Sequence, residues 1–356
     1  MEIHQLLPNF VPGDAISNHA RTLRQLLRSW GFDSEIYAHF VHPDVAHDCR
    51  SLKEFPAAAS RAVLYHYSTA SPEASHALLA VKGKRALLYH NITPAYFYAP
   101  YCDSVYAVLR AARAGLGQFR SVVDLTLGVS PYNCAELAAA GYANPCLLPL
   151  LVEFEQLASQ PPCPVTLQRF DDDWKNFLFV GRLAPHKRQE DVIRAFACYN
   201  RLVNRRSRLL LVGTAGGLER YSFHLREVVS SLEMEHHVVF AGYASLAELV
   251  AYYRLAHLFL CMSEHEGFCV PLLEAMYHRV PIIAHAAAGV PDTLGSAGIL
   301  IRDKDYPMIA EMAALLIEDE GLRGRVLARQ EKRLADFAGE PIALRFRQYV
   351  EELLAS

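Results

Sequence analysis

The feature that most constrains the fold is an alternation of short apolar runs with amphipathic helical patterns, which occurs twice along the chain. In the first part, residues 2–7, 34–41, 62–68 and 85–92 predict strands, and residues 17–30 have the helical period. Strands separated by helices need crossover connections, which are right-handed and produce a parallel sheet. The pattern therefore predicts an α/β protein whose first part is a doubly wound sheet.

The alternation restarts after a segment of different composition. Residues 160–173 hold three prolines followed by three aspartates, which is typical of a linker. Because ligands of doubly wound sheets bind at the carboxyl ends of the strands, we expect two such domains to face a central cleft. The second part has six predicted strands, at residues 176–183, 207–217, 236–243, 256–263, 280–287 and 297–303.

These patterns, together with the length of 356 residues, predict two domains rather than one core. We expect an N-terminal Rossmann-like domain over residues 1–165, which would bind the acceptor, and a C-terminal Rossmann-like domain over 166–335. The last segment, 336–356, is predicted to be a helix that packs back toward the N-terminal domain. The helical period before it is interrupted at Gly339-Glu340-Pro341.

Composition excludes several classes of protein. Hydrophobic residues make up 52% of the chain and charged residues 21%, which is typical of a globular protein. The formal net charge of -3 provides no global basic field for nucleic acid. The chain has no basic region followed by an apolar leader and no run of 18 uncharged apolar residues. We therefore expect a cytoplasmic protein without a membrane span.

Metal ligands are not grouped in the sequence. Asp171 and Asp173 have the Asp-x-Asp spacing that holds a divalent metal in some nucleotide-sugar enzymes, but they precede a predicted strand, and a solvated acidic turn explains them. We predict no metal site and no cofactor. The eight cysteines form no C-x-x-C pair and are predicted to be buried free thiols: Cys49, Cys102, Cys134, Cys146, Cys163, Cys198, Cys261 and Cys269.

The segment "SEHEGFCVPLLEAM", residues 263–276, places two carboxylates eight positions apart around a predicted helix start. Glu266 follows a predicted strand, Pro271 is suited to the first helical position, and Glu274 lies in the first turns. The free N–H groups at the helix start favour an anion, whereas the carboxylates accept hydrogen bonds from hydroxyls. The segment therefore fits a ligand that carries both phosphate and hydroxyl groups. The alternative is that the two glutamates are ordinary surface residues.

A second segment, "FLFVGRLAPHKRQEDVIRAF", favours the first of these interpretations. Arg182 follows a predicted strand, and Lys187 comes five residues later, before a helix. Because the carboxyl ends of parallel strands share one edge, both cations are expected beside the glutamates, where a diphosphate requires fixed positive charge.

"GRLAPHKR" and "EHEGFCVPLLEAMYHRVPIIAHAAAGVPD" together resemble the C-terminal domain of retaining glycosyltransferases of family four, which have the GT-B fold and a Glu-x7-Glu signature. The resemblance covers residues 177–302 closely. It implies that Arg182 and Lys187 bind the donor diphosphate, Glu266 the sugar hydroxyls and Glu274 the ribose. It also implies sugar and phosphate contacts for Gly267, Phe268, Cys269 and Val270, where Cys269 stands at a position that is glycine in many members.

The resemblance extends to weaker candidates. Gly242 and Tyr243 follow a strand at the position of the base-binding loop, although Tyr243 could equally be a packing residue. In the first domain the family's Gly-Gly loop is replaced by "PNFVPGDAISNHA", with one glycine. By position, Gly13 and Asp14 are candidates to approach the diphosphate, and Asn18 is a candidate for a further polar contact.

His90 follows a predicted strand in "LLYHNITPAYFYAP", where the family often places a histidine close to the transferred sugar. The alternative is a hydrogen-bonded core residue. The polar residues Asn91 and Thr93 and four aromatic residues nearby favour the wall of a sugar site, with His90 and Glu266 as catalytic residues. The aromatic residues are Tyr96, Phe97, Tyr98 and Tyr101.

The chemistry implied by the resemblance is transfer with retention from a nucleotide diphosphate sugar to a glycan or lipid-linked acceptor. The acceptor hydroxyl would attack on the face from which the phosphate leaves, without a metal ion, while Arg182 and Lys187 stabilise the leaving charge. Residues 17–30 form a basic amphipathic helix, and besides packing on its own sheet it could contact the inner face of a membrane. The alternatives to transfer are a nucleotide-sugar epimerase of the same fold and a catalytically silent nucleotide-sugar-binding protein.

Overall fold

The computed structural model describes residues 1–355 in two compact units. The first unit contains Met1–Tyr96, Ser104–Val152 and the chain from Phe337 onward, and the second contains Phe97–Asp103 and Glu153–Asp336. Ser356, the last residue of the predicted C-terminal helix, lies outside the described residues.

The first unit is built on a seven-stranded parallel sheet with the order β3-β2-β1-β4-β5-β6-β7. The four predicted strands are confirmed, and three short strands were not predicted because two to four residues carry too little of a pattern. The strands are β1 (Ile3–Phe10), β2 (Ile36–Val41), β3 (Arg50–Ser51), β4 (Ala62–Tyr67), β5 (Lys84–Tyr89), β6 (Leu125–Gly128) and β7 (Cys146–Leu147).

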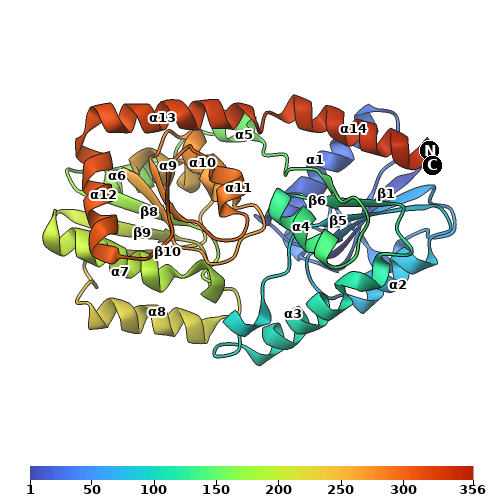
Figure 1. Ribbon diagram of the computed structural model, residues 1–356, viewed down its shortest axis with the longest axis horizontal. Helices are drawn as coiled ribbons and strands as arrows, with labels where there is room; N and C mark the ends of the chain where they lie inside the picture. Colours follow the sequence, from blue (N-terminus) through green and yellow to red (C-terminus); the bar gives the residue numbers. More distant parts are fainter. Residues whose placement is uncertain (356) are drawn as a thin grey trace. The chain divides into compact units, whose positions relative to one another are not determined.

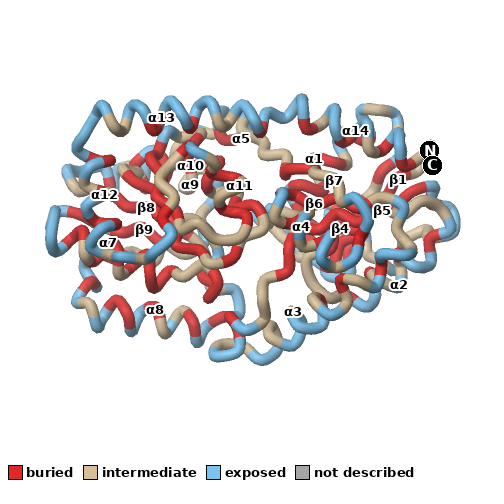
Figure 2. Tube along the Cα trace, in the orientation of Figure 1, coloured by how far each residue is buried: buried red, intermediate tan, exposed pale blue. Residues whose placement is uncertain are grey.

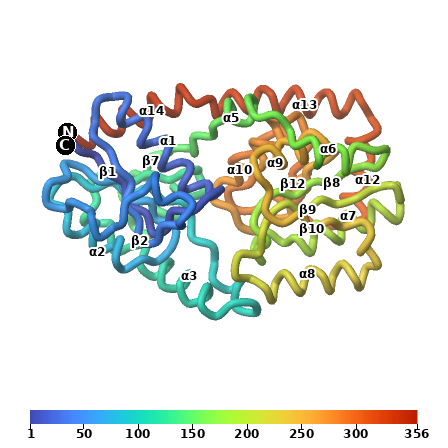
Figure 3. The backbone as a smooth tube through the Cα atoms, turned by 180° about the vertical axis from the view of Figure 1, so that it is seen from behind, coloured from blue at the N-terminus to red at the C-terminus, as the bar shows by residue number. Residues whose placement is uncertain are grey.

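Helices lie against this sheet, whose central strands are buried (Figure 2), and apolar residues of both strands and helices form the core. Figures 1 and 3 show α1 and α14 side by side, and Trp30 contacts Phe346 there with ring centroids 5.6 Å apart. The helices are α1 (Ala15–Ser29), α2 (Pro72–Ala80), α3 (Asp103–Gly115), α4 (Pro131–Ala139) and α14 (Gly339–Ala355), with short 3-10 turns at Pro43–Val45, Leu52–Glu54, Ala95–Phe97 and Leu116–Phe119.

The basic face of α1 is engaged within the first unit. Arg21 and Arg24 both pair with Asp48, and Arg28 pairs with Glu35 at 2.7 Å. Two carboxylates thus pair with three arginines, which neutralises part of the positive charge of this face. On the opposite face, Leu23 and Leu27 are fully buried, as expected for a helix that packs on its own sheet.

The second unit contains a six-stranded parallel sheet with the order β10-β9-β8-β11-β12-β13. All six predicted strands are present. The order reverses between β8 and β11, so the right-handed rule puts α7 and α8 on one face and α10 and α11 on the other (Figure 1). The strands are β8 (Lys175–Val180), β9 (Ser207–Val212), β10 (Val238–Gly242), β11 (Leu258–Cys261), β12 (Ile282–His285) and β13 (Ile299–Ile301).

The helices of this unit are amphipathic or nearly buried, and α7 packs against α12 beside the sheet. They are α5 (Phe154–Ser159), α6 (Pro164–Phe170), α7 (Gln189–Leu202), α8 (Glu219–Ser231), α9 (Leu246–Leu255), α10 (Val270–Tyr277), α11 (Val290–Leu294), α12 (Tyr306–Glu318) and α13 (Glu320–Ala335), with a 3-10 turn at Pro185–Lys187.

The connecting segments differ in detail from their predictions. Residues 160–173, predicted as a linker, contain α6, which begins at Pro164; proline suits the first helical turn because the N–H that it lacks would have no partner there. The C-terminal helical break lies just before Gly339-Glu340-Pro341, and these three residues form the first turn of α14 for the same reason.

The acidic turn and the cysteines were only partly predicted. Asp172 pairs with Arg208 and Asp173 pairs with Arg206, so both carboxylates are engaged by arginine rather than by solvent alone. Only three of the eight free thiols are buried, those of Cys49, Cys261 and Cys269. No helix within residues 1–355 is long and apolar enough to span a membrane.

Candidate active site

The carboxyl ends of β8, β9 and β10 are joined by backbone hydrogen bonds between the loops that follow them. The N–H of Leu183 donates to the carbonyl of Thr214, and the N–H of Gly213 donates to that of Gly242, both at 2.8 Å. A Cβ atom at Gly213 would lie 2.1 Å from the carbonyl oxygen of Gly181, so only glycine fits there. The sequence motifs around Arg182 and Gly242 therefore meet at one edge of the sheet.

Lys187 and Glu266 form the centre of this edge. The Nζ of Lys187 donates to the Oε1 of Glu266 at 2.6 Å, and the hydroxyl of Ser263 donates to the same oxygen at 2.8 Å. The N–H of Glu264 donates to the carbonyl of His186 at 2.8 Å, which ties the loop after β11 to the loop after β8. Two motifs separated by about 80 residues of sequence thus share a carboxylate–ammonium pair.

The charge of Lys187 is maintained by its partner. Burial works to lower the pKa of Lys187, but the negative charge of Glu266 raises the pKa above its ordinary value. The ammonium group therefore stays protonated although its side chain is largely buried, and it is a fixed positive charge at the edge of the sheet.

Arg182 supplies a second positive charge, and its side chain is exposed. Its Nη2 donates to the phenol oxygen of Tyr98 at 3.2 Å, and that oxygen lies 3.1 Å from the Nδ1 of His186. Burial raises the pKa of Tyr98, and the positive charges of Arg182 and Lys187 oppose this shift. Among the described residues, Arg182 has no carboxylate partner, so its guanidinium is available to an anionic ligand.

The turn before α10 brings backbone amides to the same edge. Cys269 has a left-handed backbone with φ 70° and is the cap of α10, which begins at Val270, one residue before Pro271. Helix starts leave unpaired N–H groups that favour negative charge. Phe268 and Cys269 are buried, and a Cβ atom at Gly289 would meet the carbonyl oxygen of Gly267 at 2.5 Å, so the turn is held closely by the loop before α11.

Glu274 lies on α10, where the phenol of Tyr253 donates to its Oε2 at 2.7 Å. Burial raises the pKa of the Glu274 carboxyl, and the hydrogen bond from Tyr253 opposes this shift. A partly desolvated carboxylate with a free acceptor oxygen can take a hydroxyl pair such as that of a ribose.

Gly242 is the last residue of β10, and Tyr243 follows it. Gly242 has φ 74°, which favours glycine, and Tyr243 is 69% exposed. The alternative that Tyr243 is a packing residue is therefore wrong, because most of its ring faces solvent.

The candidate donor-binding residues of the first unit, Gly13, Asp14 and Asn18, lie around the start of α1, and the contacts of Asp14 and Asn18 are with residues of that helix. Gly13 has φ 69°, Asp14 caps α1 by accepting from the N–H and the hydroxyl of Ser17, both at 2.9 Å, and Asn18 accepts from Arg21 at 2.7 Å. Asp14 is thus engaged as a helix cap. His90 is half-buried directly after β5.

The structure also collects three histidines that the sequence keeps far apart. His19 on α1, His66 on β4 and His90 after β5 each offer a ring nitrogen, and these three atoms lie within 4.8 Å of one another. These side chains could hold a metal ion, and the absence of a metal site stays a prediction. The group was missed because its members come from three elements and have no common spacing.

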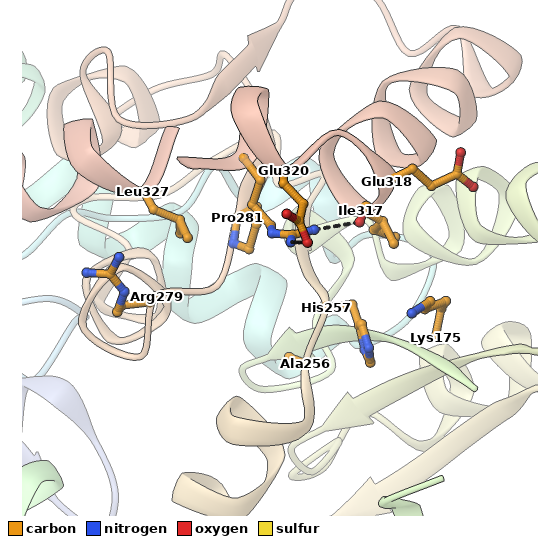
Figure 4. Close-up of a pocket in the computed structure, with 10 residues that line it drawn as sticks. Lys175, Ala256, His257, Arg279, Pro281, Ile317, Glu318, Glu320 and Leu327 are labelled. Carbon is orange, nitrogen blue, oxygen red and sulfur yellow. Dashed lines mark hydrogen bonds and ion pairs between the residues drawn. The ribbon is translucent and has the colours of Figure 1, made fainter. Parts of the chain in front are cut away.

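A pocket of about 420 Å³ lies at the opposite, amino-terminal edge of the second sheet. Figure 4 shows Lys175 at the start of β8, His257 before β11 and Pro281 before β12 around it. Arg323 donates to the carbonyl of Ile317 there at 2.6 Å. Because the predicted site residues of the second unit gather at the carboxyl edge of its sheet, this pocket is separate from them.

Comparison with known proteins agrees with this location. Residues 168–333 match the family model of glycosyl transferases group 1. The chain is 26% identical over 183 residues to O-antigen chain mannosyltransferase B of Escherichia coli, and 32% identical over 184 residues to N-acetyl-alpha-D-glucosaminyl L-malate synthase of Bacillus anthracis. Each match covers 51% of this chain, and this chain spans about half the length of these relatives, 47% and 46%.

Solved structures resemble the whole chain. Anabaena Alr3699/HepE in complex with UDP and glucose matches with a TM-score of 0.76 and 17% identity, over 99% of this chain and 100% of that one. Sucrose-phosphate synthase from Thermosynechococcus elongatus matches with a TM-score of 0.78 and 17% identity, over 99% of both chains. The fold is GT-B.

Within the GT-B fold, the partners of the site residues were not predicted as such. Ser263, Tyr253 and Tyr98 hold Glu266, Glu274 and Arg182, respectively. Ser263 stands three residues before Glu266 at the end of a strand, which was a usable signal. Tyr98 lies in the second unit, where it contacts Arg182, and its predicted place in the wall of a sugar site stays a prediction.

Proposed function

We propose that this protein is a retaining glycosyltransferase that transfers a sugar from a nucleotide diphosphate sugar to a glycan or lipid-linked acceptor in the assembly of a polysaccharide or glycoconjugate. The observation that carries the proposal is the arrangement of Arg182, Lys187, Glu266 and the start of α10 at the carboxyl edge of the second sheet. The match of residues 168–333 to glycosyl transferases group 1 supports it.

In this proposal the positive charges bind the diphosphate. Arg182 has no carboxylate partner among the described residues, and Lys187 is already fixed by Glu266 at 2.6 Å. A diphosphate near these groups would gain charge-assisted hydrogen bonds from both, and from the amide groups of Gly267 to Val270. Glu266 then accepts from sugar hydroxyls and Glu274 from the ribose, while Gly242 and Tyr243 flank the base.

Catalysis in this proposal stabilises the leaving group. The acceptor hydroxyl attacks on the face from which the nucleoside diphosphate departs, and the departing phosphate oxygen takes the proton. Arg182, Lys187 and the amide groups of α10 stabilise the charge that develops on that oxygen without requiring a metal ion. The first unit would bind the acceptor, and the contact of α1 with a membrane surface stays a prediction.

The related structures suggest which donors to test first. HepE is described in complex with UDP and glucose, and O-antigen chain mannosyltransferase B is named for mannose. A thermal-shift screen of UDP, GDP and dTDP sugars would select the donor, because a ligand that binds the folded state raises the melting temperature.

Replacement of Glu266 tests the proposed reaction. Glu266→Gln removes the charge that holds Lys187 and one acceptor for the sugar, so kcat/KM for the selected donor should fall by about 10- to 100-fold, the loss typical of a charged hydrogen bond. Transfer would be followed by release of the nucleoside diphosphate, and the anomeric configuration of the product by proton NMR. The matched control is Glu311→Gln, on the exposed face of α12.

The outcomes separate the alternatives. Retained anomeric configuration and a loss confined to Glu266→Gln support the proposal. An inverted product would contradict retention, isomerisation of the donor without an acceptor would favour an epimerase, and binding without turnover would favour a silent nucleotide-sugar-binding protein.

A further inference from the structure

Three histidines meet inside the first unit. His19 on α1, His66 on β4 and His90 after β5 each bring one ring nitrogen to within 4.8 Å of the other two. His19 is 1% exposed, His66 is 0% exposed, and His90 is half-buried. All three belong to the segment Met1–Tyr96, so the whole group lies within one compact unit. Buried imidazoles that meet in this way either share hydrogen bonds or bind a metal ion.

The ring of His66 is oriented by a buried amide. The Nε2 of Gln5 donates to the carbonyl of Ala20 at 3.0 Å, so the Oε1 of Gln5 faces His66 and lies 2.9 Å from its Nε2. An amide oxygen only accepts, so the Nε2 of His66 carries the proton, and a neutral His66 has its lone pair on Nδ1. Histidines that bind metal ions almost always donate their second ring N–H to an oxygen in this manner.

The lone pair of His66 faces the ring of His90. The Nδ1 of His66 lies 2.9 Å from the Nε2 of His90, and the two rings are nearly coplanar, with an interplanar angle of 12°. Two lone pairs repel each other at this distance, so a proton or a cation must be shared between the two nitrogens. A proton on the Nε2 of His90 is enough to explain this pair, but it does not involve the third ring.

His19 is the ring that a hydrogen-bonded pair leaves unexplained. Its Nδ1 and Nε2 are both buried, and neither has a hydrogen-bond partner among the described residues. Unpaired buried polar atoms cost free energy, so an apolar residue would be expected at a position buried this deeply. The ring lies edge-on to both others, with centroids 5.7 Å from His90 and 6.3 Å from His66. A metal ion bound by all three rings gives His19 a partner.

The three rings are neutral, as metal ligands must be. Burial lowers the pKa of His19 to about 3, and it holds the pKa values of His66 and His90 well below their usual range. Within the described part of the chain, no carboxylate pairs with any of the three rings. Each ring therefore keeps one unprotonated nitrogen at neutral pH.

The ligand atoms determine which metal ions fit. Imidazole nitrogen suits Zn²⁺ and neighbouring transition metals, whereas Mg²⁺ and Ca²⁺ prefer oxygen ligands. Two nitrogens bound to one tetrahedral Zn²⁺ at about 2.0–2.1 Å lie about 3.3 Å apart. His66 and His90 therefore need to separate by a few tenths of an ångström, and rotation of the His19 side chain must bring its nitrogen closer.

We propose that His19, His66 and His90 form a binding site for a divalent transition-metal ion of the Zn²⁺ class, and that Gln5 orients His66 for it. The ion would tie α1, β4 and the segment after β5 together. This inference does not depend on the proposed transferase function. It contradicts the prediction of no metal site, which was based on sequence spacing and could not register ligands from three separate elements.

The first test is metal binding by the full-length protein after dialysis against a chelator. Isothermal titration calorimetry with Zn²⁺ should show one equivalent bound per chain, whereas Mg²⁺ should show no binding. Zn²⁺ should also raise the melting temperature, because it binds the folded state. No stoichiometric binding of Zn²⁺, or equal binding of Mg²⁺, would overturn the proposal.

Replacement of His19 separates a metal site from a hydrogen-bonded group. His19→Leu removes no hydrogen bond to a described residue, so without metal it should melt at or above the temperature of wild type. It should bind Zn²⁺ more than about 100-fold more weakly and lose the Zn²⁺-dependent rise in melting temperature. His90→Leu, at a half-buried position, is a second variant and should show the same loss of Zn²⁺ binding.

The control is His236→Gln, at an exposed histidine, which should bind Zn²⁺ as wild type does. The chain has sixteen histidines, so a Zn²⁺ affinity that is equal in wild type, His19→Leu and His90→Leu would place the ion elsewhere and overturn the proposal.

Replacement of Gln5 tests the orientation of His66. Gln5→Met keeps the length of the side chain but removes the oxygen that accepts from the Nε2 of His66. The affinity for Zn²⁺ should fall by about 10- to 100-fold while one equivalent still binds. An affinity equal to that of wild type would contradict the role of Gln5.

Discussion

Cys269 has a backbone conformation that its side chain disfavours. It has φ 70° at the cap of α10, the region that glycine adopts freely, and its side chain is buried. The glycine that the resemblance led us to expect at this position thus has a conformational reason. Cysteine tolerates the position because the turn is held by neighbouring loops.

Two substitutions at this position should separate strain from packing. Cys269→Gly relieves the left-handed strain and loses a small buried side chain, so the free energy of unfolding should change by less than about 1 kcal/mol. Cys269→Val keeps the size but adds a β-branch, and should lose about 2 kcal/mol. Urea denaturation measures both, and equal losses would contradict a strained cap.

Glu274 combines a binding role with a cost in stability. Its raised pKa means that the folded state favours the protonated carboxyl, so the penalty of its charge is fully present above the folded pKa and disappears as pH falls below the ordinary range of about 4.3. We expect Glu274→Gln to melt at a higher temperature than wild type at pH 7. Calorimetry should show this difference shrinking toward pH 4. A difference that grows as pH falls would contradict the assignment.

At the scale of residues, the sequence was sufficient to predict where charged residues in the loops after strands lie. Arg182, Lys187 and Glu266 could be predicted to share an edge because parallel strands end together. Tyr98 and Tyr253 could not, because they come from segments with no fixed register to those strands. The contact between His66 and His90 could not be predicted either, because it depends on how β4 pairs with β5.

At the scale of elements, the start of α1 replaces the Gly-Gly loop that the resemblance led us to expect. Gly13 has positive φ and Asp14 caps the helix through Ser17. An aspartate that accepts two hydrogen bonds locally has less capacity to contact a donor diphosphate, whose charge it would also repel.

Variants of Asp14 distinguish a cap from a ligand contact. Asp14→Ala should lower the free energy of unfolding by about 1 kcal/mol, whereas Asp14→Asn, which keeps the cap, should lose only a few tenths. Because we assign the carboxylate to the cap, Asp14→Asn should leave the Kd of the sugar donor unchanged. A weakened Kd in Asp14→Asn would return Asp14 to the binding site.

The elements themselves were predictable in proportion to their length. Most strands were predicted from an apolar run, whereas β6, with four residues, and β3 and β7, with two each, depend on pairing with a neighbour rather than on their own pattern. The helix α6 was missed because three prolines within and before it resemble a linker.

At the scale of the whole molecule, the family model matches the second unit and not the first. The family model covers residues 168–333, which lie in the second unit, and Arg182, Lys187, Glu266 and Glu274 all fall there. With a formal net charge of -3, the chain has no global field that would attract a diphosphate, so binding must come from the local charges. The family model covers no residue of the first unit, so it gives no indication of the acceptor.

The most direct test of the account is the Kd of the selected nucleoside diphosphate, measured by isothermal titration calorimetry on wild type, Arg182→Ala and Arg329→Ala. Both arginines are exposed in the second unit, but Arg329 lies on α13. Loss of a charged hydrogen bond to phosphate should weaken binding by about 10- to 100-fold in Arg182→Ala and leave Arg329→Ala equal to wild type. Equal affinities in all three proteins, or no binding of any nucleoside diphosphate, would contradict a donor site at this edge.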